Sequence, residues 1–176
     1  CTSYDQISKI KMKYLEFTDV EIHELKSEII GETFEILVKQ PDPQILSLFG
    51  NKPLPVVYGT DANLSAGGYI NTLEGLLLGG EIPPVLFIGI RYKLGDEPDF
   101  MQFVTSRTRE FTPTEDAENQ KLMEQMTLRE VKGGGAENFL KFLTTELRDW
   151  VSERFNVSDD TTYIGDSMGC LLYTSD

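Results

Sequence analysis

The stretch that decides the fold is residues 161–169, which read Thr-Thr-Tyr-Ile-Gly-Asp-Ser-Met-Gly. Its first half predicts a short strand, and Gly165 to Gly169 then fit the pattern G-x-S-x-G. In this pattern a serine lies at a sharp turn between a strand and a helix, and glycines on both sides avoid Cβ clashes there. The stretch therefore predicts a nucleophile elbow, with Ser167 as the nucleophile and the backbone N–H of Met168 as a donor to an oxyanion.

The bare pattern also occurs by chance in Gly-rich turns, so the elements before it matter. Two continuous apolar runs, residues 54–58 and 84–90, are typical of parallel strands that are buried on both faces. A helical pattern lies between them and ends at Gly79. Farther upstream, residues 17–25 and 32–39 alternate apolar and polar side chains, which predicts an antiparallel hairpin. Together these patterns predict an α/β fold with a βαβ unit.

The next stretch, residues 91–135, shows no clear hydrophobic period. Segments of this length are typically functional or mobile, and we expect this one to form part of the entrance to a site. From Ala136 onward the helical period returns, which predicts a crossover helix before the strand that leads to Ser167. We expect its aromatic residues, including Trp150, to pack in the core.

Composition and charge narrow the choice of partners. The 176 residues fit one domain, and 16 Lys and Arg against 29 Asp and Glu give a net charge of −13. This balance argues against binding to nucleic acid or to an anionic membrane. No apolar run approaches the roughly 20 residues that a membrane span needs. The single histidine, His23, leaves little material for His-based catalysis or a metal site, and we expect it to be an exposed strand residue.

The two cysteines, Cys1 and Cys170, have neither the spacing of a metal site nor the number for a disulfide framework. They leave the compartment open, with a cytoplasmic setting slightly favoured. Because Cys1 stands where a methionine would begin a chain, we expect a fragment, and a processed or lipidated start is the alternative.

An ordered series of motifs extends the pattern well beyond the elbow. Asp61 follows the first buried run, residues 107–114 read Arg-Thr-Arg-Glu-Phe-Thr-Pro-Thr, and residues 133–140 read Gly-Gly-Gly-Ala-Glu-Asn-Phe-Leu. With the elbow, these motifs resemble the putative-esterase family of α/β-hydrolases, which includes esterase D-like enzymes and enterochelin esterases. The resemblance covers about residues 17–169, and it implies the N-terminal part of an α/β-hydrolase fold that ends near the nucleophile elbow.

The resemblance also implies roles for individual residues. Ser167 would form the acyl-enzyme, and the Met168 N–H would be one oxyanion donor. The second donor would come from the loop after the first buried run, where Asn63 is the expected N–H. Ala62 stands where the family often has glycine, so the match at this loop is imperfect.

For Arg107 and Arg109 the resemblance allows contact with an acidic group of a substrate, and structural arginines held in ion pairs are the alternative. The implied substrate is a small-molecule ester, with no metal and no organic cofactor. Three functions stay open: a serine ester hydrolase, an acyltransferase on the same fold, and a non-catalytic binding protein on a decayed hydrolase fold.

The triad order in this fold is Ser, then Asp or Glu, then His. None of the nine residues after Ser167 is a histidine, so the base is not among them. We therefore expect residues 1–169 to be a partial α/β-hydrolase domain. Residues 170–176 read Cys-Leu-Leu-Tyr-Thr-Ser-Asp, which departs from the family pattern and resembles translated adapter sequence, so we expect a non-native tail.

Overall fold

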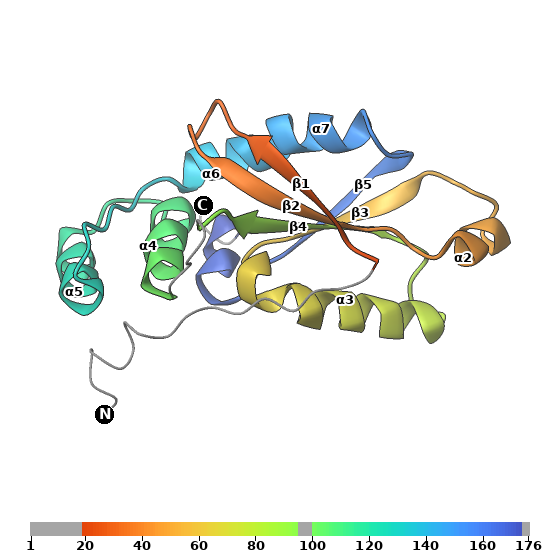
Figure 1. Ribbon diagram of the computed structural model, residues 1–176, viewed down its shortest axis with the longest axis horizontal. Coiled ribbons are helices and arrows are strands. Elements are labelled where there is room, and N and C mark those ends of the chain that lie inside the picture. Colours follow the sequence, from red (N-terminus) through yellow and green to blue (C-terminus); the bar gives the residue numbers. More distant parts are fainter. Residues whose placement is uncertain (1–18, 95–99, 174–176) are drawn as a thin grey trace.

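A computed structural model describes residues 19–94 and 100–173 as a twisted five-stranded sheet with helices on both faces (Figure 1). The strands are β1 (Glu21–Lys26), β2 (Thr33–Lys39), β3 (Leu54–Gly59), β4 (Leu86–Tyr92) and β5 (Val157–Ile164), in the spatial order β1-β2-β4-β3-β5. The helices are α2 (Pro43–Leu48), α3 (Ala62–Leu78), α4 (Phe100–Phe111), α5 (Ala117–Thr127), α6 (Ala136–Phe142) and α7 (Arg148–Ser152). A π-helical turn, Leu143–Leu147, joins α6 to α7, and a 3₁₀ helix, Ser167–Tyr173, follows β5.

The predicted antiparallel hairpin is confirmed as β1 and β2, which pair from Glu21 opposite Val38 to Lys26 opposite Thr33. Residues 17–18 of the first predicted strand lie outside the described residues. β2 also pairs antiparallel with β4, so the hairpin forms one side of the sheet. Its inner strand β2 is mostly buried, whereas the outer strand β1 is largely exposed.

The predicted βαβ unit is confirmed as β3, α3 and β4. β3 and β4 pair in parallel, and every residue of β4 is buried, which explains the apolar run up to Ile90. The one charged residue of β4, Arg91, is buried too and pairs with Glu35 at 2.6 Å. α3 covers one face of the sheet, while α6 and α7 cover the other (Figure 1). The main core lies on the side of α6 and α7, where Phe34 of β2 stacks on Phe142 with ring centroids 4.9 Å apart.

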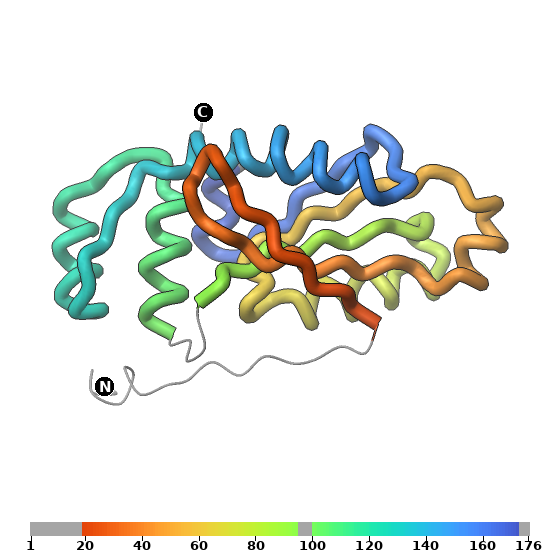
Figure 2. The backbone as a smooth tube through the Cα atoms, turned by 45° about the horizontal axis from the view of Figure 1, so that its top comes forward, coloured from red at the N-terminus to blue at the C-terminus, as the bar shows by residue number. Residues whose placement is uncertain are grey.

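The stretch without a clear period, residues 91–135, contains two helices, α4 and α5, which the sequence pattern did not predict. The apolar period of α4 is hidden because two of its buried positions hold the polar residues Thr108 and Glu110. α5 leaves Leu122 and Met126 exposed, so its sequence carries no clean buried stripe either. Both helices lie at one end of the sheet, and α2 lies at the other (Figure 2).

The crossover helix expected after Ala136 is present but interrupted by the π-helical turn. This turn places Glu146 against the β1–β2 hairpin, where one carboxylate oxygen accepts the Ser27 hydroxyl at 2.6 Å and the other accepts the Glu28 N–H at 3.0 Å. β5 then adds in parallel to β3 and is the outer described strand on the side opposite β1. Within residues 19–94 and 100–173, no helix has both the length and the apolar character to cross a bilayer.

Candidate active site

Ser167 lies where β5 turns into a helix. β5 ends at Ile164, Gly165 and Asp166 form the turn, and Ser167 begins the 3₁₀ helix. The side chain of Ser167 is exposed, and its φ of +54° is in the left-handed region that non-glycine residues rarely adopt. Such backbone strain clusters at active sites, and this strand-turn-helix geometry is the context that a nucleophile elbow requires.

The two glycines of the motif lie where the surrounding atoms leave no room for a side chain. A Cβ at Gly165 would lie 2.6 Å from the carbonyl carbon and oxygen of Gly169, and a Cβ at Gly169 would lie 2.7 Å from Oγ1 of Thr60. The turn is closed by the Gly169 N–H, which donates to the Asp166 carbonyl at 2.9 Å. Because N–H groups in the first turn of a helix have no carbonyl partner inside that helix, the position of Met168 suits a donor to an external oxyanion.

The turn between β3 and α3 lies directly beside residues 165–169, the predicted elbow, which is called the elbow below. The Thr60 N–H donates to the carbonyl of Ile164, the last residue of β5, at 3.1 Å. Asp61 follows with φ at +56° and is the N-cap of α3, although its side chain makes no capping hydrogen bond. The first turn of α3 therefore points its N-terminal end toward the same edge of the sheet as Ser167.

Asn63, the expected second oxyanion donor, lies in that first turn of α3. Its side chain is buried and is bound to the end of β4: Nδ2 donates to the Tyr92 carbonyl at 3.0 Å, and Oδ1 accepts the Tyr92 N–H at 2.8 Å. The amide side chain thus ties the start of α3 to β4. The role of the Asn63 backbone N–H toward an oxyanion stays a prediction.

Arg107 of α4 reaches both segments. Its Nε and Nη2 donate to Oδ1 and Oδ2 of Asp61 at 3.0 and 2.6 Å, and Nη2 also donates to the Asp166 carbonyl at 3.1 Å. Asp61 is only 3% exposed. Burial raises the pKa of the Asp61 carboxyl, and the Arg107 guanidinium only partly offsets that rise.

Arg109, two residues farther along α4, forms ion pairs with two glutamates. Its Nε donates to Oε1 of Glu110 at 2.7 Å, and its Nη1 donates to Oε1 of Glu32 at 2.9 Å. Burial raises the pKa of Glu110, against the opposing effect of the Arg109 charge. Arg107 and Arg109 are thus both held in ion pairs, which is the alternative that the sequence left open.

His23 does not lie near Ser167. It is on β1, which is one outer strand of the sheet, whereas Ser167 follows β5, the other outer strand. Four strand spacings of about 4.8 Å separate the two by roughly 19 Å. The imidazole instead contacts the Glu21 carboxylate at 3.1 Å and the Trp150 ring at a centroid distance of 5.3 Å. The single histidine of the chain is therefore not placed to act as the base.

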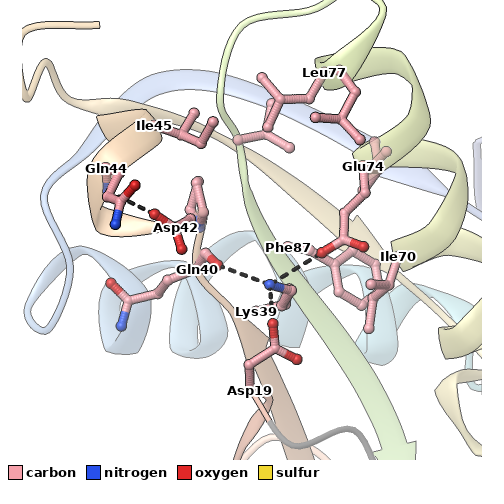
Figure 3. Close-up of a pocket in the computed structure, with 14 residues that line it drawn as sticks. Asp19, Lys39, Gln40, Asp42, Gln44, Ile45, Ile70, Glu74, Leu77 and Phe87 are labelled. Atoms are coloured by element: carbon pink, nitrogen blue, oxygen red, sulfur yellow. Dashed lines mark hydrogen bonds and ion pairs between the residues drawn. The ribbon is translucent and has the colours of Figure 1, made fainter. Parts of the chain in front are cut away.

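A cavity of about 450 Å³ lies between the segment after β2 and the C-terminal half of α3 (Figure 3). It is at the opposite end of the sheet from the elbow. Its wall includes Phe87 near the start of β4 and Ile45 of α2, whereas Ser167 follows the carboxyl end of the parallel strand β5. Lys39 lines the cavity, and its ammonium group pairs with Asp19 at 2.5 Å and with Glu74 at 3.1 Å. Burial lowers the pKa of Lys39, but the hydrogen bonds to these two carboxylates outweigh burial and leave the pKa raised. The charged groups Lys39, Asp19 and Glu74 of this cavity pair with one another and are separate from the elbow.

Sequence reasoning missed the pairing of Asp61 with Arg107. The sequence marks Asp61 only as the residue that follows a buried strand, and Arg107 only as part of a motif. The available signal for this ion pair was an acidic residue between a buried strand and a helix, together with an arginine elsewhere in the motif series. It does not reveal the partner, because the two residues lie 46 positions apart.

Comparisons with known proteins identify relatives of this chain. The family model described as "Putative esterase" matches residues 27–172. The IroE-like serine hydrolase from Shewanella oneidensis is 25% identical with a TM-score of 0.69, over 87% of this chain and 44% of that one. The BES protein from Bacillus cereus is 20% identical with a TM-score of 0.66, over 93% and 57% of the two chains. The siderophore hydrolase EstB from Aspergillus nidulans is 21% identical with a TM-score of 0.60, over 91% and 53%.

The chain spans about half the length of these solved structures. Their α/β-hydrolase-type fold is the fold of this chain, of which the described residues form a part. A search of curated proteins gave no match.

Proposed function

Because the chain belongs to the putative esterase family, we propose that it carries the nucleophile and oxyanion donors of a serine hydrolase that acts on small-molecule carboxylic esters. The observation that supports this most directly is the backbone of Ser167, which has a positive φ at a strand-to-helix turn whose two glycines leave no room for a Cβ. A Gly-rich turn without a function has no need for an exposed serine in that strained conformation.

In the proposed reaction, Oγ of Ser167 attacks the carbonyl carbon of the ester. The carbonyl oxygen becomes negatively charged in the tetrahedral intermediate, and the N–H groups of Met168 and Asn63 donate hydrogen bonds to it. Collapse of the intermediate breaks the bond to the alcohol, which leaves protonated, and the acyl group stays on Ser167 as an ester. Water then hydrolyses this acyl-enzyme, which releases the acyl group as a carboxylic acid and restores the serine hydroxyl.

The proton of Ser167 must pass to a base, which in this fold is a histidine oriented by an acid. Since His23 lies across the sheet, the proposal requires a base from outside residues 1–176. The siderophore hydrolase among the structural neighbours makes a siderophore ester the first natural substrate to test.

The proposal can be tested on the chain itself with a fluorophosphonate probe, which phosphonylates activated serines. Imidazole is added as an exogenous base in place of the histidine, and the modified residue is identified by peptide mass spectrometry. We expect the probe to modify Ser167, and we expect imidazole to speed that modification. The Ser167→Ala variant should take up no label at this peptide, whereas Ser152→Ala, which removes an exposed serine of α7, should label like the original chain.

Absence of label at Ser167 with imidazole present would contradict the proposal. Labelling of other serines at the same rate as Ser167 would contradict it equally, because the elbow would then give its serine no special reactivity.

A further inference from the structure

One arginine contacts both of the loops that supply the proposed oxyanion donors. We propose that Arg107 is a positioning residue that clamps the turn between β3 and α3 to the nucleophile elbow. The purpose of the clamp, which is to hold two N–H donors around one oxyanion, rests on the proposed function. The clamp itself rests on the contacts of Arg107, and it acts through Asp61 and Asp166.

The guanidinium group makes three hydrogen bonds to two segments. It donates twice to the carboxylate of Asp61, at 3.0 and 2.6 Å, and once to the carbonyl of Asp166, at 3.1 Å. Asp61 directly precedes α3, and Asp166 directly precedes Ser167. Because the guanidinium fork is planar and rigid, its donors fix the two segments relative to each other.

Arg107 is itself held in place by the aromatic side chains of its own helix. Its guanidinium carbon lies 5.5 Å from the ring centroid of Phe103 and 5.6 Å from that of Phe111, and both rings are buried in the core. These are cation–π distances, and they restrict the rotamer of the arginine. α4 also packs against the 3₁₀ helix that begins at Ser167. The clamp therefore has a rigid base.

Both clamped segments contain a residue with strained backbone. Asp61 has φ at +56° and Ser167 at +54°. Such conformations persist only when surrounding contacts hold them. Arg107 binds the side chain of the first residue and the carbonyl beside the second, so losing it removes support from both strained positions at once.

A lysine at position 107 separates the clamp from a simple ion pair. A lysine ammonium is a compact charge that can pair with the Asp61 carboxylate, but it lacks the fork that reaches the Asp166 carbonyl in the same geometry. If Arg107 is a clamp, Arg107→Lys should keep the β3–α3 turn in place while the elbow loosens. If Arg107 only neutralises Asp61, Arg107→Lys should behave like the original chain at both sites.

Amide hydrogen exchange measured by mass spectrometry on the intact chain tests this. In Arg107→Gln we expect exchange of residues 61–65 and 165–169 to become about tenfold faster, while the buried strand β4 keeps its rate. In Arg107→Lys only residues 165–169 should show this acceleration. The matched control is Lys39→Gln, because Lys39 is 13% exposed against 15% for Arg107 and likewise joins two segments, through the carboxylates of Asp19 and Glu74 at the other end of the sheet. It should leave both segments unchanged.

If Arg107→Gln does not fold, Asp61→Asn replaces it, since the amide keeps the size of the carboxylate and removes its charge. Asp61→Asn should accelerate exchange in both segments. The proposal is overturned if exchange at residues 165–169 changes less than twofold in these variants, or if it rises equally throughout the sheet. Failure of the proposed function shows separately, as a missing fluorophosphonate label on Ser167, and it leaves the exchange result intact.

Discussion

Thr60 and Gly169 lie so close together that a Cβ atom at position 169 would be 2.7 Å from Oγ1 of Thr60. The contact joins the end of β3 to the 3₁₀ helix behind the elbow, and Thr60 is buried. The hydrogen bond from the Thr60 N–H to the Ile164 carbonyl, at 3.1 Å, also joins the end of β3 to the end of β5, just before the elbow. The sizes of residues 60 and 169 are therefore coupled, although the two positions lie far apart in the chain.

This coupling predicts a suppressor pair. Gly169→Ala should lower the free energy of unfolding by about 1–3 kcal/mol, because the added methyl group overpacks a closed contact. Thr60→Ala in the same chain removes the clashing hydroxyl and should restore more than half of that loss. Urea unfolding of the two single variants and the double variant measures the interaction energy.

The control for that cycle is Gly68→Ala, at a helical glycine of α3 whose Cβ would meet nothing within 4 Å. It should raise the free energy of unfolding by roughly 0.5–1 kcal/mol, because alanine is the better helix former. A double variant no more stable than Gly169→Ala alone would show that Thr60 is not the source of the strain.

The backbone of Ser167 predicts that glycine is more stable than alanine at this position. Both Ser167→Gly and Ser167→Ala remove the hydroxyl, so their difference isolates the backbone strain at φ +54°. We expect the glycine variant to be more stable by about 1 kcal/mol, since glycine adopts positive φ without a steric cost. Thermal unfolding of the two variants gives the comparison.

At Ser152 we expect the stability difference between the glycine and alanine variants to have the opposite sign. Ser152 lies in the helix α7, where alanine is favoured over glycine by roughly 1 kcal/mol. If alanine were also the more stable residue at position 167, the left-handed conformation of the elbow would be refuted.

Burial of Asp61 predicts a pH dependence of stability. The folded-state pKa of Asp61 is raised above its ordinary value of 3.8, so at acid pH the folded chain binds this proton more tightly than the unfolded chain. The stabilising contribution of the proton is therefore fully present below pH 3.8 and is lost as the pH rises through the folded-state pKa. Relative to Asp61→Asn, the free energy of unfolding of the original chain should fall between pH 3.8 and the folded-state pKa of Asp61. At higher pH the difference between the two chains should stay constant.

The measurement is the difference in unfolding free energy between the original chain and Asp61→Asn from acid to neutral pH. Because Asp61→Asn leaves the other acidic groups in place, their titration cancels in the difference. A difference that grows in favour of the original chain with rising pH would mean that Arg107 outweighs burial and that folding lowers the pKa of Asp61.

The sequence predicted those parts of the fold that depend on local patterns. The apolar run of β4 and the alternation along β1 and β2 identified the strands, because burial on two faces or on one leaves a direct trace in the order of residues. The turn that holds Ser167 was predicted for a similar reason, since it needs glycines at fixed spacing around the serine. These signals lie within a few residues of the feature that they predict.

The helix α4 and the side-chain contacts around the candidate site depend on residues that are distant in the sequence. Such contacts leave no local pattern in the order of residues. The buried polar residues of α4, Thr108 and Glu110, hid its helical period, because a carboxylate paired in the interior reads as a surface residue in sequence. The hydrogen bond from Asn63 to Tyr92 and the ion pair of Arg107 with Asp61 likewise join residues that lie far apart in the sequence. Motif resemblance indicated that some of these residues matter but did not give their partners.

The separation of His23 from Ser167 predicts that this chain is a poor esterase by itself. Without a base to accept its proton, a serine hydroxyl is a weak nucleophile at neutral pH, whatever the quality of its oxyanion donors. Hydrolysis of p-nitrophenyl acetate by the chain should therefore be no faster than by Ser167→Ala, measured as release of p-nitrophenol at equal protein concentration. His23→Ala should match both, because the imidazole is bound to Glu21 and Trp150 across the sheet. Turnover that depends on Ser167 and survives His23→Ala would reveal another base within the 176 residues and would overturn this account of the proton transfer.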